Sequence, residues 1–391
     1  LENLIKDAVK IRLESDVEVG SFLSGGIDSS LISQVMSEVS EKKINTFSVG
    51  FIEKDYDESR DAREIAKYIG SNHHEILIGE KELLNVFDNL PNIYDEPFAD
   101  SSQIPTAIVS NYARKYAGVI LSGDGGDELF GGYTRYLEAK KQIDKKEDIE
   151  INFKKKIGRI ILNLNPNFIK LIEKLTQKHN LVEKSKNYLK FHHKENKTYL
   201  DFLCQWHSLN EILENQFISD ELKNEADYDF IKNDYEKFMA YDLNEYLPND
   251  ILTKVDRASM NYGLEVRVPL LDYRIVKFSS RLKIDNKISS NYQKRILKEV
   301  LKKRIPNKLI KNKKVGFGIP IDEWLRSFLK ERVDYLLSKE CLGQNPYLNS
   351  ATVQKLWFEH QNNIQNHGIK LWNIISFQNW ININKEFLIE K

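Results

Sequence analysis

The chain has 391 residues, and its 58 lysines and arginines balance its 58 aspartates and glutamates to a formal net charge of zero. This balance argues against nucleic acid or an anionic membrane as a partner. A hydrophobic share of 41% with 30% charged residues is typical of a large globular unit, and no apolar run reaches the roughly 20 residues of a membrane-spanning helix. Two cysteines and no signal peptide predict a cytoplasmic location.

The first third of the chain alternates between helical patterns and short apolar runs. It opens on an amphipathic helix that carries Leu4, Ile5 and Ala8 on one face. Runs of strand length follow at residues 19–23, 44–51, 74–78 and 119–121. This is the rhythm of βαβ units in a parallel sheet, and after Tyr133 amphipathic helices dominate. We therefore predict an α/β fold with a parallel-sheet core followed by a mostly helical C-terminal part.

A glycine turn with flanking hydroxyls follows the first expected strand, at residues 24–30 (Ser-Gly-Gly-Ile-Asp-Ser-Ser). A glycine turn before a helix presents backbone N–H groups and the positive helix end to an anion, and glycine lets a phosphate come close. The turn lacks the lysine of a Walker A loop and the glycine spacing of a dinucleotide loop. Ser24, Ser29 and Ser30 are candidate donors to phosphate oxygens.

A second glycine turn, loaded with carboxylates, follows the fourth expected strand at residues 122–133. If the first and fourth strands are neighbours, both turns open at the same edge of the sheet, where open α/β sheets bind ligands. Asp28 in the first turn would repel phosphate unless a divalent cation lies between them. Two aspartates from two loops suit Mg²⁺, which takes one or two protein carboxylates when phosphates supply other ligands. We therefore expect Asp28 and Asp127 to share one Mg²⁺.

Both turns resemble motifs of a known family. Residues 24–29 are similar to the Ser-Gly-Gly-x-Asp-Ser loop of the ATP pyrophosphatases, and residues 121–133 are similar to a signature of the asparagine synthetases within that superfamily. Further similar stretches lie at 45–51, 94–102, 253–272 and 314–320. The resemblance covers nearly the whole chain and implies an adenine nucleotide α-hydrolase-like core.

The resemblance also implies roles for individual residues. Lys314 is implied as the catalytic lysine, although Asn312-Lys313 replaces the family's Arg-Pro and leaves Lys313 open as the active residue. Asp124 is implied as the base of the second half-reaction, and Glu265 is implied near the acyl acceptor. The implied ATP and pyrophosphate contacts are Leu23, Ser24, Gly25, Gly26, Asp28, Ser29, Ser30, Val49, Ser122 and Gly123, and the implied metal ligands are Asp28 and Asp127.

The implied activity is ATP-dependent amide synthesis. Aspartate would react with ATP to β-aspartyl-AMP and pyrophosphate, and ammonia would then release asparagine and AMP, with ATP and Mg²⁺ as cofactors. Glutamine-using members begin with a glutaminase domain that has a catalytic cysteine. We expect this domain to be absent here, so that ammonia comes from a glutaminase domain or subunit elsewhere. The resemblance leaves a homodimer open.

Two alternatives stay open at this point. The first is that the chain is a relative with the same fold that adenylates a different carboxylate, such as a sugar acid, a peptide or a β-amino acid. The second is that the chain is a module that binds nucleotide without turnover. In either case we expect one asparagine-synthetase-like domain over residues 1–391, divided into an α/β ATP-binding core (1–135), a lysine-rich helical segment (136–235) and a helical part that completes the site (236–391).

Two features are interpreted as structural. Cys204 and Cys341 lack a Cys-x-x-Cys spacing or an adjacent histidine and are expected to be buried, inert thiols. His73 and His74 are adjacent in an expected strand, so their side chains point to opposite faces and do not chelate a metal together.

Overall fold

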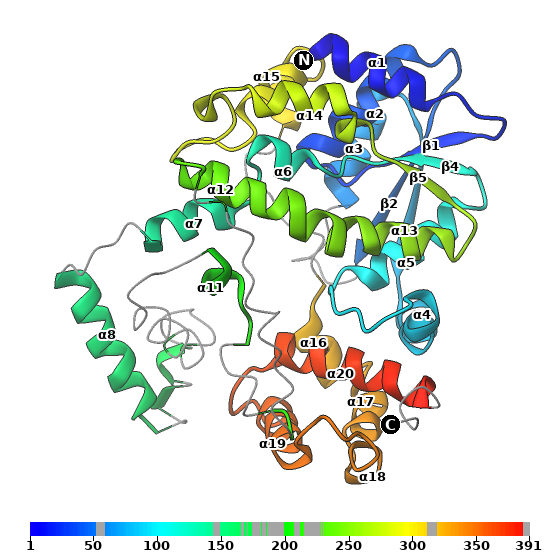
Figure 1. Cartoon of the computed structure of the whole chain (residues 1–391). Coiled ribbons are helices and arrows are strands. Elements are labelled where there is room, and N and C mark those ends of the chain that lie inside the picture. The colour runs from blue at the N-terminus through cyan, green and yellow to red at the C-terminus, as the bar shows by residue number, and fades with distance from the viewer. Residues whose placement is uncertain are drawn as a thin grey trace. The chain divides into compact units, whose positions relative to one another are not determined.

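The computed structural model describes residues 1–51, 59–143, 149–165, 230–310 and 319–385, with shorter pieces between 168 and 228. Its sheet has five strands, all parallel, in the order β3-β2-β1-β4-β5 (Figure 1). The strands are β1 (Val19–Phe22), β2 (Asn45–Phe51), β3 (Asn72–Ile78), β4 (Val119–Leu121) and β5 (Glu265–Arg267). The α/β prediction is confirmed, and β1 and β4 are neighbours as expected.

The order of the strands places a switch point between β1 and β4. From β1 the chain builds the sheet in one direction through β2 and β3, and it then returns to add β4 and β5 on the other side. Loops at the carboxyl ends of two such strands diverge and leave a crevice in which open α/β sheets bind ligands. The loops after β1 and β4 are the two glycine turns that the sequence singles out.

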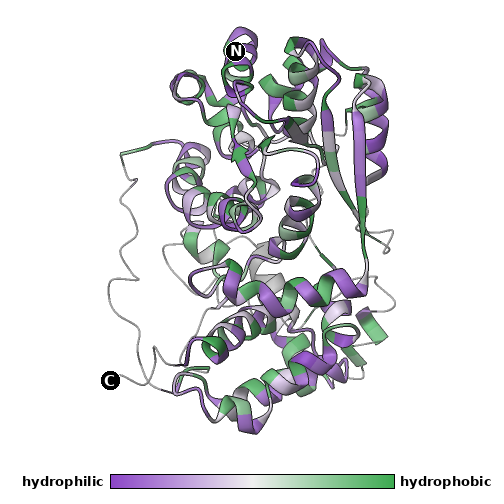
Figure 2. Cartoon of the chain, turned by 90° about the vertical axis from the view of Figure 1, so that its right-hand side faces the viewer, coloured by the Kyte–Doolittle hydropathy of each residue, from purple (hydrophilic) through white to green (hydrophobic). Residues whose placement is uncertain are grey.

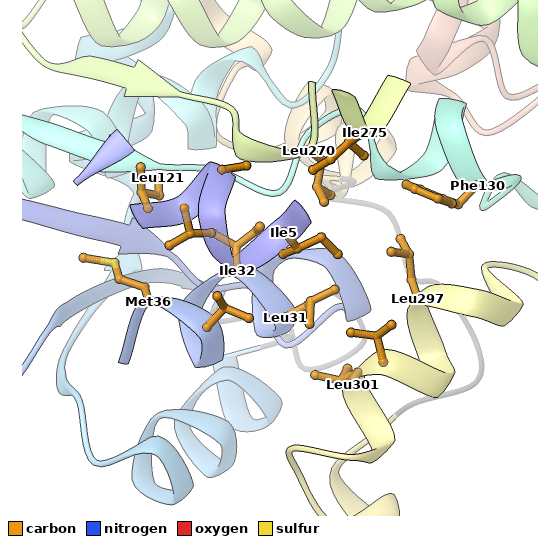
Figure 3. Packing of buried hydrophobic residues seen from close by; sticks show 14 of the residues in the cluster. Ile5, Leu31, Ile32, Met36, Leu121, Phe130, Leu270, Ile275, Leu297 and Leu301 are labelled. Carbon is orange, nitrogen blue, oxygen red and sulfur yellow. The ribbon is translucent and has the colours of Figure 1, made fainter. Parts of the chain in front are cut away.

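Helices in the first part of the chain precede β1 or connect the strands. They are α1 (Glu2–Arg12), α2 (Ile27–Val39), α3 (Ser59–Ile69), α4 (Glu80–Ile93) and α5 (Gln103–Ala113). The predicted amphipathic helix is α1, which buries Ile5, Ala8 and Val9. Apolar residues from α1 and α2 pack in one core with α15 (Arg295–Lys302), as Figure 3 shows for Ile5, Leu31 and Leu297. This core fixes α15 against α2, whose N-terminus follows the first glycine turn.

Later helices complete the surroundings of the loops. They are α6 (Gly126–Phe130), α7 (Thr134–Ile143), α12 (Asp234–Tyr241), α13 (Thr253–Met260) and α14 (Tyr273–Ser280). A π-helical stretch, Asp242–Leu252, joins α12 to α13, so that the three form one continuous run in Figure 1. Pro248 lies inside this stretch, where it cannot donate a backbone hydrogen bond. The wider π-helical turns accommodate this loss and bring α13 against α5.

The chain forms two compact units. The first contains residues 1–95, 100–137 and 226–320 and holds the whole sheet; the second contains residues 96–99, 138–225 and 321–391. The sheet unit is discontinuous along the chain, because residues 226–320 return to supply β5 and α12 to α15 to it, and the division of the chain into three consecutive segments stays a prediction.

The second unit is helical where the structure describes it. Its helices are α8 (Ile149–Leu162), α11 (Tyr199–Leu203), α16 (Ile321–Arg326), α17 (Lys330–Leu336), α18 (Lys339–Leu342), α19 (Ser350–Gln361) and α20 (Gly368–Ile383). Hydrophilic and hydrophobic residues alternate along most of the helices in Figure 2, which agrees with the amphipathic pattern. In the described part of the chain, no helix combines the length and apolar character needed to span a membrane.

The expectations for the cysteines are half correct. Cys341 is buried in α18, whereas Cys204 is exposed, which corrects the prediction for that thiol. The reason is local, since α11 ends at Leu203 and leaves Cys204 in the loop that follows.

The expectation for the adjacent histidines is confirmed. His73 contacts the hydroxyls of Thr46 and Ser48, whereas His74 contacts Asn45, so the two rings lie on opposite faces of the sheet.

Candidate functional site

The first glycine turn is held tightly between β1 and α3. Leu23 continues the pairing of β1 by donating its N–H to the Phe47 carbonyl at 2.8 Å. Gly25 has a φ of +83°, and a Cβ at this position would lie 2.7 Å from the Asp61 Cβ on α3. Glycine is therefore required twice at Gly25, for its backbone conformation and for the close approach of α3. The chain then enters α2 with Gly26 immediately before its first residue.

The three serines of this turn have different environments. The hydroxyls of Ser24 and Ser29 lie 3.0 Å apart, and both residues are half-buried. Ser30 is buried, and its hydroxyl donates to the Gly26 carbonyl at 2.5 Å. The structure therefore places Ser24 and Ser29 where a ligand can reach them, while the Ser30 hydroxyl is used inside the first turn of α2.

The second glycine turn lies directly against the first. A Cβ at Gly123 would come within 2.7 Å of the Ser29 nitrogen, and one at Gly126 would come within 2.5 Å of the Asp28 Cγ. Contacts this short leave no room for a side chain at either position. The absence of side chains is thus what allows the two loops to meet.

Asp28 and Asp127 converge on one cation. The Lys294 Nζ lies 2.7 Å from Asp127 Oδ1 and also pairs with Asp28 Oδ2. The Lys294 side chain is only 5% exposed, and those of both aspartates are 13% exposed. Burial alone would lower the pKa of Lys294, but the charges of Asp127 and Asp28 outweigh burial and raise it. The ammonium therefore stays charged at neutral pH.

A divalent cation fits these two carboxylates. Their oxygens already converge on a single positive charge, which is the arrangement that a shared metal ligand pair needs. No group of three or more potential metal-ligating side chains occurs among the described residues. Two carboxylates with phosphate oxygens and waters as the remaining ligands are what Mg²⁺ commonly uses in nucleotide sites. Asp28 and Asp127 thus share one cationic partner, Lys294, and their sharing of one Mg²⁺ stays a prediction.

The other two acids of the second turn have partners of their own. The Ser122 hydroxyl donates to the Asp124 carboxylate, and the Asp124 N–H donates back to the Ser122 oxygen at 3.2 Å. The Tyr133 hydroxyl donates to Glu128 Oε1 at 2.5 Å. The three acids of this turn therefore differ in their contacts, and Asp127 is the one that shares Lys294 with Asp28 among the ion pairs described.

A second buried charge cluster lies beside this site. Lys254 Nζ pairs with Asp100 Oδ2 at 2.8 Å, and its charge also interacts with Asp124. The Ser102 N–H and hydroxyl both donate to Asp100 Oδ1 at 2.6 Å. Asp250, from the π-helical stretch, is hydrogen-bonded to Asp100. Residues 100–102 thus meet residues 250–254, although Asp100 and Lys254 are 154 positions apart in the sequence.

The two carboxyls of this cluster are shifted in opposite directions. Burial raises the pKa of Asp250 to about 8, and the negative charge of Asp100 and the hydrogen bond between the two carboxyls add to this. Burial would also raise the pKa of Asp100, but the charge of Lys254 and hydrogen bonds from Asp250, Lys254 and Ser102 lower it. Asp250 therefore keeps a proton at neutral pH and donates it to the ionised Asp100.

Of the remaining predicted residues, Glu265 lies away from the two glycine turns, Val49 lies toward the end of β2 that neighbours the first turn, and Lys314 cannot be placed. Glu265 is the first residue of β5 and pairs with Val119, the first residue of β4, so it lies at the opposite edge of the sheet from the loops. It is exposed and bonded to Arg267. Val49 is buried within β2, opposite Ile76. Lys314 and its alternative Lys313 lie outside the described residues.

Sequence reasoning did not identify Lys294, Lys254 or Asp250 as site residues. Lys294 is one of many lysines, and no glycine turn precedes it in the sequence. The sequence indicated Lys294 only indirectly, because two carboxylates that are brought together in a buried place require a positively charged partner. The segments that hold Asp100 and Lys254 were both singled out, but nothing in either segment says that they touch.

Comparison with known proteins shows the family to which the chain belongs. The sequence profile described as asparagine synthase matches residues 1–382. The chain belongs to the asparagine synthase family. It is 29% identical over 393 residues to asparagine synthetase [glutamine-hydrolyzing] 1 of Bacillus subtilis, covering 100% of this chain and 60% of the relative. It is 28% identical over 382 residues to a putative asparagine synthetase [glutamine-hydrolyzing] of Mycobacterium tuberculosis, covering 96% and 56%.

A shorter match has a higher identity. Over 137 residues the chain is 49% identical to putative asparagine synthetase [glutamine-hydrolyzing] 2 of Methanocaldococcus jannaschii, covering 35% of this chain and 26% of the relative. This asparagine synthase family chain thus spans 60% or less of the length of each of these three relatives. The resemblance drawn from the two glycine turns is confirmed at the level of the family.

Proposed function

We propose that this chain is an ATP-dependent amide synthetase that forms asparagine from aspartate and ammonia and releases AMP and pyrophosphate. One observation carries the proposal. Asp28 and Asp127 come from two glycine turns that follow neighbouring parallel strands, and their carboxylates converge on one cation position. A magnesium polyphosphate is the ligand that suits a glycine turn at a helix N-terminus with two such carboxylates beside it.

The first half-reaction activates the carboxylate. A carboxylate oxygen of aspartate attacks the α-phosphorus of ATP, the bond to the β-phosphate oxygen breaks, and β-aspartyl-AMP and pyrophosphate form. The loop N–H groups and the hydroxyls of Ser24 and Ser29 are available to hold the leaving pyrophosphate. Mg²⁺ held by Asp28 and Asp127 would neutralise the charge that develops on it.

The second half-reaction forms the amide. Ammonia attacks the acyl carbon, the bond to the AMP oxygen breaks, and the nitrogen must lose a proton. We assign the proton acceptor to Asp124, which lies at the carboxyl end of β4 and is oriented by Ser122. Asp250 holds its own proton and is not free to accept one, so its pair with Asp100 serves to fix Lys254 beside Asp124.

The source of ammonia belongs to the same proposal. The relatives are named as glutamine-hydrolysing synthetases, and this chain spans only part of their length. We therefore propose that a glutaminase domain or subunit supplies ammonia in the cell. The chain by itself would use ammonium salts.

Pyrophosphate release by the purified chain tests this proposal. With Mg-ATP and ammonium chloride, release is expected to depend on aspartate and to be accompanied by asparagine. Replacing ammonium by glutamine should stop asparagine formation in the chain alone. Release that ignores aspartate but follows another carboxylate would contradict the assignment of aspartate. ATP binding without any release under these conditions would contradict the synthetase reaction.

A further inference from the structure

Lys294 reaches the two aspartates from a rigid position. Lys294 immediately precedes α15. The buried Leu297, Val300 and Leu301 of this helix pack in the same core as α2. The backbone of Lys294 has a φ of 50°, in the left-handed region that residues other than glycine rarely adopt. The core therefore holds Lys294 in an unfavourable backbone conformation, and its ammonium lies between Asp28 and Asp127 as a consequence.

The ammonium uses the same carboxylates that a divalent cation would use. Asp28 Oδ2 and Asp127 Oδ1 both pair with Lys294 Nζ, and there is one buried positive charge between them. A second cation at this place competes for these oxygens and is repelled by the ammonium. A displaced ammonium in turn needs a new anion, because an unpaired buried charge is strongly unfavourable. A polyphosphate that arrives with the metal is such an anion.

We propose that Lys294 is an internal counter-cation that fills the metal position until nucleotide binds, so that Mg²⁺ enters only together with the polyphosphate. This order of binding rests on the proposed function for its ligand, a magnesium polyphosphate. It also gives Lys294 a positioning role, since the lysine keeps both carboxylates at one point before the metal arrives. If Lys294 only stabilised the fold, removing its charge would leave the affinity for Mg²⁺ in the absence of nucleotide unchanged.

The test compares Mg²⁺ binding by nucleotide-free wild type and by Lys294→Met, using calorimetry and thermal unfolding. Methionine keeps an unbranched apolar stem and removes the charge. Wild type is expected to show no change in Tm between EDTA and millimolar Mg²⁺. Lys294→Met is expected to have a lower Tm in EDTA, to recover it in Mg²⁺, and to bind Mg²⁺ at least about tenfold more tightly than wild type.

Two further variants complete the test. Lys302→Met, on the same helix, removes a lysine that pairs only with exposed Glu299 among the contacts described, and it should behave as wild type. Lys294→Met combined with Asp28→Asn leaves Asp127 as the one charge of these three residues, so it should be more stable in EDTA than Lys294→Met and should lose the tight Mg²⁺ binding. The comparison of this double variant with wild type keeps the test decisive if Lys294→Met alone unfolds in EDTA.

Two results would overturn the inference. One is wild type binding Mg²⁺ without nucleotide as tightly as Lys294→Met does. The other is a loss of stability in Lys294→Met that Mg²⁺ leaves unchanged. Because these measurements contain no ATP and no aspartate, they can fail while pyrophosphate release succeeds. Conversely, absent pyrophosphate release with the expected Mg²⁺ behaviour would contradict the synthetase reaction alone.

Discussion

At the scale of single residues, the site depends on two glycines that have no side chain. Gly123 and Gly126 lie so close to the start of α2 that a Cβ on either would overlap Asp28 or Ser29. Asp28 can meet Asp127 and Lys294 only because these positions carry no side chain. The glycines of the second turn therefore bring charges together, in addition to shaping the backbone.

Gly126→Ala isolates this effect. Gly126 is not among the glycines with positive φ, so alanine is tolerated by the backbone, and the three atoms nearest to the new methyl group all belong to the Asp28 carboxylate. We expect pyrophosphate release to fall by about 10²-fold or more, as for loss of a well-placed charge-stabilising group. Steady-state kinetics with Mg-ATP, aspartate and ammonium chloride measure this.

Gly70→Ala is the matched control. Gly70 has a φ of +72°, and no atom lies within 4 Å of the place that a Cβ would take, so alanine there strains the backbone and displaces nothing. It should lower the free energy of unfolding by about 1 kcal/mol and leave the turnover intact. Equal turnover for Gly126→Ala and wild type would show that the contact with Asp28 is dispensable.

Residues were predictable where the chemistry is local. Asp28 and Asp127 each stand in a glycine turn after an apolar run, and the parallel sheet brings the two turns together. Lys294 was not predictable, because its place is set by the packing of α15 on α2 and by an unusual φ. Cys204 was predicted incorrectly for a related reason, since the end of α11 decides its exposure.

At the scale of elements, the π-helical stretch Asp242–Leu252 connects two clusters of charge. Near its start, the buried Asp242 pairs with Arg135 at 2.7 Å, and the Arg135 guanidinium lies over the Tyr246 ring. Near its end, Asp250 joins Asp100, and Lys254 follows in α13. The stretch therefore anchors one end of α13 through buried polar contacts.

Asp250→Asn tests the protonated carboxyl in this stretch. The pKa of Asp250 is raised in the folded chain to about 8, so between about pH 4 and pH 8 the unfolded chain loses this proton while the folded chain keeps it. The carboxyl therefore makes the protein less stable as pH rises through this window. Asparagine keeps a donor for Asp100 and has no proton to lose.

We expect Asp250→Asn to gain stability relative to wild type between pH 5 and pH 8, by on the order of 1 kcal/mol or more. Denaturant unfolding at both pH values measures the difference. Asp16→Asn, at an exposed residue, is the control and should show no pH-dependent difference. If the difference in stability between Asp250→Asn and wild type is the same at both pH values, Asp250 does not keep a proton that it donates to Asp100.

Elements were predictable where hydrophobicity decides them. The strands β1 to β4 coincide with the apolar runs within two residues at either end. The fifth strand was missed because its residues, Glu-Val-Arg, are mostly charged, and only pairing with β4 makes them a strand. Its position also explains why Glu265 lies away from the loops, since β5 enters the sheet at that residue.

At the scale of the whole molecule, the sheet order explains where the site lies. Strands are added on one side of β1 up to β3 and on its other side from β4 onward, and the two glycine turns follow β1 and β4. Residues 226–320 return to the sheet unit and bring Asp250, Lys254 and Lys294 to it. Sequence patterns predicted the sheet and its ligand edge, whereas this return depends on tertiary packing.

The transfer of ¹⁸O from the aspartate side-chain carboxylate tests the central claim most directly. If the carboxylate attacks the α-phosphorus and ammonia then displaces AMP, one labelled oxygen must remain in the AMP. Mass spectrometry of the nucleotide, with Mg-ATP and ammonium chloride present, is predicted to show AMP that carries a single ¹⁸O for each asparagine formed. Unlabelled AMP, or ADP with the label in inorganic phosphate, would contradict the account.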